Sequence, residues 1–341
     1  MKVWFESRVH HLGGIFNGSV DSSADSFATN LDILGKPLVI HNLENLVEGP
    51  RSVERISFPE GSNGAADLVQ ARFPRVDVDE YDSDTLQPPD GEDSLRVPFN
   101  SLVAGSGNGN HVVSEIVYPW ELLVAIMKLL YAQVTSTEIA EDAHVARSAV
   151  MEGPCIIRKG ASVDDFCKIK GPAYLGENSK VGTGSLLRGT VLCKDASIGF
   201  GNEVGRSYVG ERVRITHHDV ILDSLVGENS WMAAYVGTTN VLLNNRNVRY
   251  RIRAEVVDTG LPNFGAVISH DCSIGAGVIF LPGRYVPPRS VIKPGVVYSD
   301  EQSLYVSESR SRPIPGTMFA GPASVPAVEL HRGDDSRDRN R

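Results

Sequence analysis

The sequence predicts two structural units: an N-terminal α/β unit, then a left-handed parallel β-helix built from hexapeptide repeats. The main observation is an apolar residue at every sixth position between residues 139 and 187. These positions are Ile139, Val145, Met151, Ile157, Val163, Ile169, Leu175, Val181 and Leu187, and the register returns as Ile268, Ile274, Phe280, Val286 and Ile292. A period of six fits neither an α-helix nor a half-buried strand, but it fits a triangular coil of about 18 residues with three short strands.

A second observation is that glycine often follows the apolar position directly. This occurs at Gly176, Gly182, Gly199, Gly210, Gly227 and Gly275. A triangular coil must turn tightly after each short strand, and glycine adopts positive φ angles without strain. We therefore expect these glycines to be turn residues with positive φ.

Composition limits the classes of protein. The 341 residues carry a formal net charge of −9, which argues against general binding to nucleic acid or to anionic membranes. The four cysteines form no CxxC pair, and three lie within the repeats, so we expect buried, reduced thiols. The N-terminus has no apolar leader and no apolar run reaches ~18 residues, which predicts a soluble, cytoplasmic protein.

The organisation along the chain follows from these patterns. We expect an α/β unit over 1–117, a connecting helix over 118–136, the β-helix over 137–299, and a C-terminal extension with a disordered tail over 300–341. Within the first unit, the pattern predicts strands at 1–6, 53–58 and 76–78, a helix at 38–47, and loops at EGSNGAAD and PPDGEDS. The hexapeptide period breaks between residues 238 and 263, which predicts an extruded loop.

Several segments resemble a known family. GPAYLGENSKVGTGSLLRG, IGFGNEVGRSYVGE and NFGAVISHDCSIGAGVIFLPG are similar to the C-terminal β-helix of sugar-1-phosphate nucleotidyltransferases, in particular the bifunctional enzyme that acetylates glucosamine-1-phosphate and then uridylylates it. LGKPLVIHNLENL resembles the segment that follows the phosphate loop of that family, and MKVWFES lies where its first strand would be. The resemblance implies a homotrimer with a groove for the acyl donor between subunits, and a small, degenerate nucleotidyltransferase-like first unit.

The first unit departs from that family. Its opening stretch, RVHHLGGIFNGSVDSSADSF, has glycines but lacks the Gly-rich, Arg-containing loop that holds nucleotide phosphates. The unit is also about half as long, and no Gly-Asp pair is placed to hold Mg²⁺. Nucleotidyl transfer depends on positioning and metal electrostatics, so we expect it to be absent, and residual nucleotidyl transfer remains only an alternative.

The resemblance assigns candidate residues for acyl transfer. His217, in THHDVILDSLVGEN, matches the histidine that takes the proton from the substrate amine, a role suited to a group with a pKa near 7. Arg188 matches an arginine that holds the substrate phosphate, and Asn240 an asparagine that contacts the sugar. Structural alternatives stay open: a solvated turn histidine or one bonded to Asp219, an arginine paired with a neighbouring coil, and an asparagine in a left-handed turn.

Other positions depart from the acetyltransferase pattern. Gly205 replaces a phosphate-binding lysine, although Arg206 could substitute, and Val220 and Trp231 replace polar substrate contacts. In the extruded segment RNVRYRIR, a strand would place three arginines on one face, where they could bind the phosphates of CoA. They are Arg249, Arg251 and Arg253. The alternative is a solvated basic strand.

A metal site is not expected. His217, His218 and His270 lack the spacing of the zinc-binding β-helix enzymes, and adjacent histidines on a strand diverge.

The residues together predict CoA-dependent acyl transfer, from acetyl-CoA or another acyl-CoA, to a sugar phosphate or nucleotide-sugar-like acceptor. A catalytically silent relative that binds a sugar nucleotide and regulates a partner remains the alternative, which Gly205, Val220 and Trp231 favour.

Overall fold

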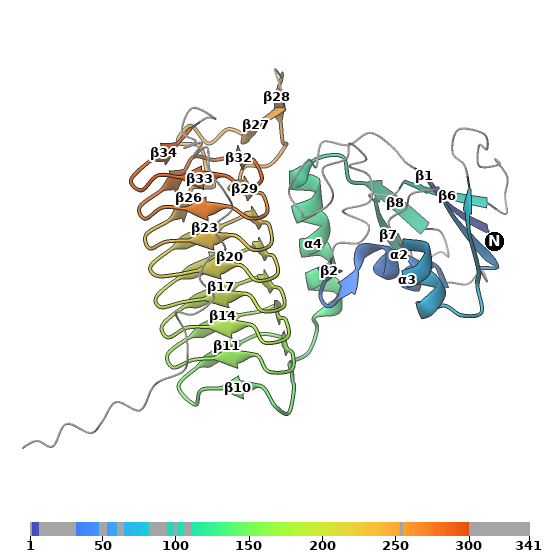
Figure 1. The fold of residues 1–341 in the computed structure, drawn as a ribbon, viewed down its shortest axis with the longest axis horizontal. Helices are drawn as coiled ribbons and strands as arrows, with labels where there is room; N and C mark the ends of the chain where they lie inside the picture. Colours follow the sequence, from blue (N-terminus) through green and yellow to red (C-terminus); the bar gives the residue numbers. More distant parts are fainter. Residues whose placement is uncertain are drawn as a thin grey trace, which may run out of the picture. The chain divides into compact units, whose positions relative to one another are not determined.

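A computed structural model describes residues 2–6, 32–47, 53–59, 65–81, 94–98, 101–105, 111–252 and 255–299 (Figure 1). The predicted extension and tail over 300–341 lie outside the described residues. The fold class predicted from the sequence is confirmed, since an α/β unit precedes a left-handed parallel β-helix. The exact domain boundaries stay predictions.

The first unit is built on a four-stranded parallel sheet in the order β5-β4-β1-β6. Its elements are β1 (Lys2–Glu6), α2 (Leu38–Val47), β4 (Arg55–Pro59), α3 (Ala65–Arg72), β5 (Asp77–Tyr81) and β6 (Ser94–Pro98), with the hairpins β2 (Asp32–Ile33)–β3 (Lys36–Pro37) and β7 (Ser101–Gly105)–β8 (His111–Glu115). The helix at 38–47 and the strands near 1–6, 53–58 and 76–78 are confirmed. The predicted loop EGSNGAAD is wrong at its end, because α3 begins at Ala65 and buries Ala65 and Val69.

The connecting helix α4 (Pro119–Gln133) is confirmed and begins with proline at its first position. Glu121 in its first turn folds back on the preceding chain: its carboxylate accepts hydrogen bonds from the backbone N–H groups of Val117 and Tyr118 at 2.7 and 3.0 Å. The buried face of α4, with Trp120, Leu122, Leu123, Ala125, Ile126, Leu129 and Leu130, shares one apolar cluster with residues of the β-helix such as Tyr174 and Tyr208.

Three eight-stranded parallel sheets form the faces of the β-helix (Figure 1). Sheet 1 contains β10 (His144–Val145), β13 (Ser162–Val163), β16 (Lys180–Val181), β19 (Ser197–Ile198), β22 (Arg214–Ile215), β25 (Trp231–Met232), β30 (Ser273–Ile274) and β33 (Val291–Ile292). Sheet 2 contains β11 (Val150–Glu152), β14 (Lys168–Lys170), β17 (Leu186–Arg188), β20 (Glu203–Gly205), β23 (Val220–Leu222), β26 (Gly237–Thr238), β31 (Ile279–Phe280) and β34 (Val297–Tyr298). Sheet 3 contains β9 (Glu138–Ile139), β12 (Cys155–Ile157), β15 (Ala173–Leu175), β18 (Val191–Leu192), β21 (Tyr208–Val209), β24 (Leu225–Val226), β29 (Ala266–Ile268) and β32 (Arg284–Val286).

The repeating apolar residues fill the interior of the prism from Ile157 onward, as predicted, but the first position of the predicted register, Ile139, is 48% exposed. From Ile157 to Leu187 every sixth residue is buried, and so is the returning register from Ile268 to Ile292. The coil length changes along the prism. Ile157 pairs with Leu175, eighteen residues later, whereas Leu175 pairs with Leu192 and Leu192 with Val209, each seventeen residues later. One turn per coil is therefore a residue shorter between Leu187 and Val226, and the eighteen-residue coil returns where Ile268 pairs with Val286.

The glycines that follow the apolar positions lie where the chain begins to turn, as predicted: the carbonyls of Gly176 and Gly210 accept the backbone N–H groups of Ser179 and Val213. The positive φ that could accompany these turns is absent at these glycines, although other glycines of the prism have it. A Cβ on Gly199 would lie 2.0 Å from the carbonyl oxygen of Thr216, and one on Gly176 would lie 2.7 Å from the backbone of Cys193. These positions need glycine because the backbone of the next coil passes directly over them, not because φ is positive there.

Replacing Gly199 with alanine should lower the free energy of unfolding by about 3 kcal/mol, because neither backbone can move without breaking the coil ladder. Gly237→Ala is the matched control, since its Cβ would meet only the end of the flexible Ile279 side chain, at 3.1 Å. Urea unfolding of both variants measures the difference. Equal losses of stability would contradict the close-approach explanation.

The break in the period is an extruded segment, as predicted. It contains β27 (Arg249–Ile252) and β28 (Glu255–Asp258), which form an antiparallel hairpin. The hairpin buries the side chain of Tyr250. Its ring centroid lies 5.4 Å from that of Trp120 and 6.1 Å from that of Phe264. The hairpin is thus anchored by one aromatic side chain while its arginines stay exposed.

Candidate functional site

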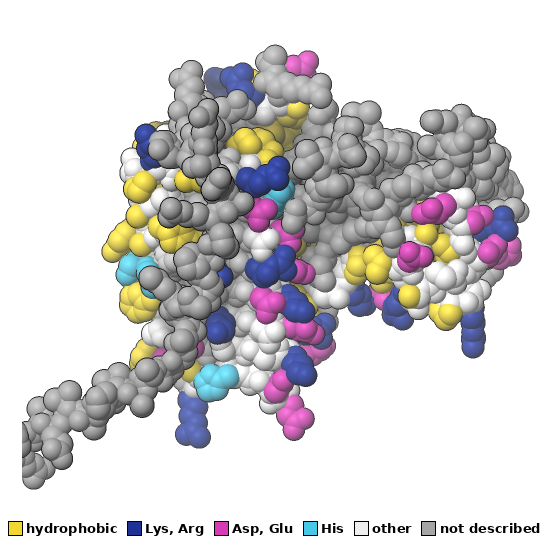
Figure 2. Space-filling model, viewed as in Figure 1, with side chains coloured by type: hydrophobic (Ala, Val, Ile, Leu, Met, Phe, Trp, Pro, Cys, Tyr) yellow, Lys and Arg dark blue, Asp and Glu magenta, His cyan; other side chains and the backbone are white. Residues whose placement is uncertain are grey.

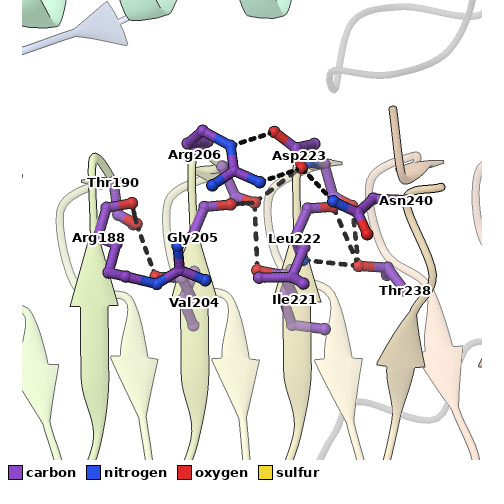
Figure 3. A network of polar contacts seen from close by, with 12 residues as sticks. Arg188, Thr190, Val204, Gly205, Arg206, Ile221, Leu222, Asp223, Thr238 and Asn240 are labelled. Carbon is purple, nitrogen blue, oxygen red and sulfur yellow. Dashed lines mark hydrogen bonds and ion pairs between the residues drawn. The ribbon is translucent and has the colours of Figure 1, made fainter. Parts of the chain in front are cut away.

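Three of the predicted acceptor residues gather at one edge of the prism (Figure 3). We call this edge the arginine corner; it comprises the turns between sheets 2 and 3 at residues 188–190, 205–207, 222–224 and 239–240. Arg188 ends β17, Arg206 follows β20 directly, and Asn240 lies two residues after β26. Because successive coils stack in register, these three side chains lie on neighbouring coils although they are far apart in the sequence.

An aspartate that sequence reasoning missed joins two of them. Asp223 accepts hydrogen bonds from Nε and a terminal nitrogen of Arg206, both at 2.6 Å, and from the side-chain amide of Asn240 at 2.5 Å. Its backbone is left-handed, with φ of +46°, and only 9% of its side chain is exposed. The hydrogen bond to Asp223 raises the pKa of Arg206. The signal that could have found Asp223 is its spacing of one coil, seventeen residues, from both partners.

Arg188 is paired as well. Its guanidinium contacts Glu203 of the next coil, which is the structural alternative stated above, and 30% of its side chain remains exposed. A Cβ on Gly205 would lie 3.2 Å from the Arg188 guanidinium. The glycine that replaces the lysine of the family pattern therefore leaves room for Arg188 to lie across the corner.

Buried hydroxyls hold the arginine corner from inside. Thr190 donates to the carbonyl of Val204 at 3.0 Å, Ser207 to that of Gly205 at 2.8 Å, and Ser224 to that of Leu222 at 2.7 Å (Figure 3). Each hydroxyl donates a hydrogen bond to a backbone carbonyl near the turn, and these bonds make the corner rigid without apolar packing. Rigid backbone at this edge fixes where the paired side chains emerge.

His217 lies at a different edge of the prism. We call it the imidazole corner; it comprises the turns between sheets 1 and 2 at residues 200–201, 217–218, 234–235 and 276–277. His217 is exposed, and among the described residues its imidazole has no hydrogen-bond or ionic partner. The alternative of a bond to Asp219 is excluded for this structure, because Asp219 points into the prism and accepts the backbone N–H of Val236 at 2.6 Å.

Asp219 is an unusual carboxyl group for a protein interior. It is fully buried, one of its oxygens has no partner among the described residues, and burial raises its pKa to about 7. It continues a polar column in which Ser185 donates to the carbonyl of Gly199 and Asn202 donates to that of Thr216. Asn202 also accepts the backbone N–H of Asp219 at 2.7 Å. A protonated Asp219 would continue the column as a donor.

A second imidazole is oriented by a carboxylate, and sequence reasoning considered it only as a metal ligand. Nδ1 of His270 lies 2.8 Å from a carboxylate oxygen of Asp271, and 7% of the His270 side chain is exposed. The pair occupies the turn between sheets 3 and 1, with Asp271 in a left-handed conformation. An imidazole whose Nδ1 is held by a carboxylate presents Nε2 in a defined direction, which is an arrangement suited to a general base. Adjacent His and Asp at a turn were the available signal.

The predicted basic strand is present. Arg249 and Arg251 both lie exposed on β27, on the face opposite to buried Tyr250. Arg253 lies outside the described residues. The structure thus places two of the three arginines on one exposed face of the hairpin.

The described residues contain no group of His, Cys, Asp or Glu that could hold a metal ion, and His217 and His218 lie at a different corner from His270. All four cysteines are free and buried, and burial raises the pKa of Cys272 to about 12. No helix within the described part of the chain is long and apolar enough to cross a membrane.

Comparison with known proteins places the chain among its relatives. No family model matches it. The bifunctional protein GlmU of Methanococcus aeolicus is 27% identical over 262 residues, which are 75% of this chain and 61% of that protein. An uncharacterized acetyltransferase of Escherichia coli, YaiX, is 28% identical over 169 residues, 49% of this chain and 72% of that one. The chain is similar to the bifunctional sugar-1-phosphate nucleotidyltransferase/acetyltransferase proteins, as its sequence predicted.

The similarity has limits. The matched region spans 61% of the length of the Methanococcus protein. Among solved structures, perosamine N-acetyltransferase from Caulobacter crescentus, in complex with CoA and GDP-perosamine, is 13% identical with a TM-score of 0.21 over 70% of this chain and 93% of that one. The acetyltransferase domain of PglB from Neisseria gonorrhoeae, in complex with acetyl coenzyme A, is 11% identical with a TM-score of 0.16. That match covers 70% of this chain and 96% of that one. Scores this low carry no argument about the activity of this chain.

Proposed function

We propose that the protein is a CoA-dependent acyltransferase that acts on an amine or hydroxyl of a sugar phosphate or nucleotide sugar. The proposal is supported by relatives named as acetyltransferases and by an exposed imidazole and exposed arginines on the β-helix. The observation that carries it is the arrangement of sheet 2, which has His217 at one edge and the arginine corner at the other. The acceptor amine would attack the thioester carbonyl, forming an N–C bond while the C–S bond breaks. The imidazole would take the amine proton and return it to the leaving thiolate.

A complete site would need more than one copy of the chain. Asp223 follows His218 by five positions that include strand β23, so the two edges of sheet 2 are roughly 16 Å apart at the usual rise of ~3.3 Å per residue. One sugar phosphate cannot span that distance while reacting at an acyl group. We therefore propose a homotrimer in which the imidazole corner of one subunit faces a neighbour, with β27 arginines holding the cofactor phosphates. The buried, free cysteines are consistent with a proposed cytoplasmic location.

The catalytically silent alternative is favoured by one observation. Arg206 and Asn240 are bound to Asp223, and Arg188 is bound to Glu203, so each predicted acceptor ligand already has an internal partner. A protein that only binds a sugar nucleotide would keep such a corner for stability. Acyl transfer distinguishes the two functions directly.

The test is release of free thiol from acetyl-CoA by the full chain with amino-sugar 1-phosphates and nucleotide amino sugars. Turnover with an acceptor, and a mass of three chains in solution, would support the proposal. Binding of a sugar nucleotide without turnover would support the silent alternative, and a monomer at micromolar concentration would remove the shared site.

Arg188→Ala should raise KM for the phosphorylated acceptor by about tenfold with little change in kcat, because a phosphate ligand contributes in both the ground and transition states. Glu203→Gln is the matched control: it releases the guanidinium while keeping the corner polar, so KM should stay the same or fall. Steady-state kinetics with a phosphorylated acceptor measure both. A fall in kcat alone for Arg188→Ala would contradict the assigned role.

A further inference from the structure

We propose that the imidazole corner binds the base of a nucleotide, which stacks on the outer face of the Tyr235 ring. The proposed donor, an acyl-CoA, carries a nucleotide, and a nucleotide-sugar acceptor carries one as well. The inference therefore deepens the proposed function, and it rests on that function for the identity of the nucleotide. The ligand class is a planar heteroaromatic ring. The argument depends on a ladder of exposed rings that ends at a position with no side chain.

The aromatic ladder consists of Phe200, His218 and Tyr235, one ring on each of three successive coils. The rings of His218 and Tyr235 are stacked, with centroids 5.4 Å apart and planes 15° apart, and Phe200 meets His218 edge-on at 5.1 Å. Adjacent coils lie ~4.8 Å apart, which matches the 4.5–7 Å between centroids of interacting aromatic rings. Phe200 and Tyr235 are 50% and 63% exposed. Figure 2 shows hydrophobic side chains above and below histidine along the left edge of the β-helix.

Each ring of the ladder lies over the coil before it. A Cβ on Gly201 would lie 2.8 Å from Nδ1 of His218, and one on Gly184 would lie 4.0 Å from the Phe200 ring. The next position above Tyr235 is Gly277, which has a φ of +69° like the rest of this register. Among the described residues, a Cβ there would meet only backbone atoms of Gly295, at 3.9 and 4.0 Å. No described residue therefore fills the place where the next ring of the ladder would lie.

Gly277 is not required by the backbone at this position. Phe166, His218 and Tyr235 occupy the same register with φ between +56° and +64°, so this corner accepts side chains in the left-handed conformation. The open place also lacks the close coil contact that requires glycine at Gly199. A ring supplied by a ligand would continue the ladder with the same spacing as its own members. Stacking of a base on an aromatic side chain is a general mode of binding that tolerates any base.

The charge near the ladder suits a nucleotide although the chain is acidic overall. The turns at 182–184, 199–201, 216–218, 233–235 and 275–277 contain no Asp or Glu, and Asp219 is buried. On the adjoining face of sheet 1, Arg214 pairs in register with Trp231 and has no carboxylate partner among the described residues. Within the described part of the chain, the turns of this corner thus carry no exposed acid, and an arginine lies on the adjoining face.

The experiment is isothermal titration of the full chain with AMP, UMP and ribose 5-phosphate. The nucleotides should bind at least about fivefold more tightly than ribose 5-phosphate, because one stacked base contributes ~1–3 kcal/mol. Gly277→Phe, which fills the open place, and Tyr235→Ala, which removes the platform, should each abolish that difference. Tyr235→Phe, which keeps the ring, and Phe166→Ala, which removes an exposed ring from the same register outside the ladder, should leave it within twofold. Thermal unfolding confirms that each variant is folded.

Two further arms identify the source of the base. Coenzyme A is compared with pantetheine, and UDP-glucose with glucose 1-phosphate, in the wild type and in Gly277→Phe. Loss of affinity confined to coenzyme A assigns adenine of the cofactor, and loss confined to UDP-glucose assigns the acceptor nucleotide. Equal binding of AMP and ribose 5-phosphate overturns the proposal. So does an unchanged preference for AMP and UMP over ribose 5-phosphate in Gly277→Phe and Tyr235→Ala. Base-dependent binding by a protein without turnover would leave this site standing and remove the proposed acyl transfer.

Discussion

His217→Ala should lower kcat for acyl transfer by about 10²–10⁴ while the affinity for acyl-CoA stays nearly unchanged, as expected when a general base is removed. His217 is exposed and has no partner among the described residues, so its removal leaves the fold intact. The measurement is thiol release under saturating acceptor, with acyl-CoA affinity measured separately by titration. An acyl-CoA affinity lost together with the rate would contradict a role confined to proton transfer.

The matched comparison is the His270–Asp271 pair. Asp271→Asn keeps the left-handed turn and the size of the side chain but removes the carboxylate that orients the imidazole. If His217 is the base, Asp271→Asn should change kcat by less than about threefold. A large loss in Asp271→Asn together with a normal rate in His217→Ala would move the base to His270. Normal rates in both variants would exclude both imidazoles as the base.

Asp219→Asn should raise the free energy of unfolding at pH 8 by on the order of 4 kcal/mol and leave it nearly unchanged at pH 4. Burial raises the pKa of Asp219 from its usual value of 3.8 to about 7, so the folded protein binds this proton more tightly than the unfolded chain does. The resulting stability is complete below pH 3.8 and is lost as the pH rises towards 7, because the buried carboxylate must then be charged. Each pH unit across this window corresponds to about 1.4 kcal/mol.

Asparagine suits this position because Asn202, in the coil below, donates its amide hydrogen to the carbonyl of Thr216. The control is the reverse change, Asn202→Asp, which places a second carboxyl group in the same column and should make stability fall more steeply between pH 4 and 7. Urea unfolding at several pH values measures both variants. An Asp219→Asn protein with the same pH dependence as the wild type would show that Asp219 is ionised at no significant cost.

Local patterns in the sequence were sufficient for much of the fold. The six-residue spacing from Ile157 to Leu187 predicted the interior of the prism correctly. Each hexapeptide buries its apolar residue against apolar residues of its own coil and of the neighbouring coils. The proline at the start of α4 and the alternation of Arg249 and Arg251 were likewise local signals. In the first unit, α3 and β6–β8 were missed because they are only five to eight residues long, which is too short for a clear apolar period.

The candidate site was predictable only in part. Arg188, Arg206 and Asn240 were identified as residues, and their gathering at one corner follows from the repeat, yet their binding partners did not. The arginines are bound by Glu203 and Asp223, which come from neighbouring coils. Similarly, the aromatic ladder joins Phe200, His218 and Tyr235 across three coils, and no pair of them is adjacent in sequence.

The repeat pattern alone was enough to predict the prism, its apolar interior and the chemical types at its corners. The tertiary structure decided why Gly199 is glycine, which carboxylates pair with the arginines, that Asp219 points inward, and that His217 and the arginine corner lie at opposite edges of sheet 2. The physical reason is the length of the coil. A coil has eighteen residues up to Leu175, seventeen between Leu175 and Val226, and eighteen again from Ile268. This length sets which side chains of successive coils meet, and the one-residue difference takes effect only when the backbones pack against each other.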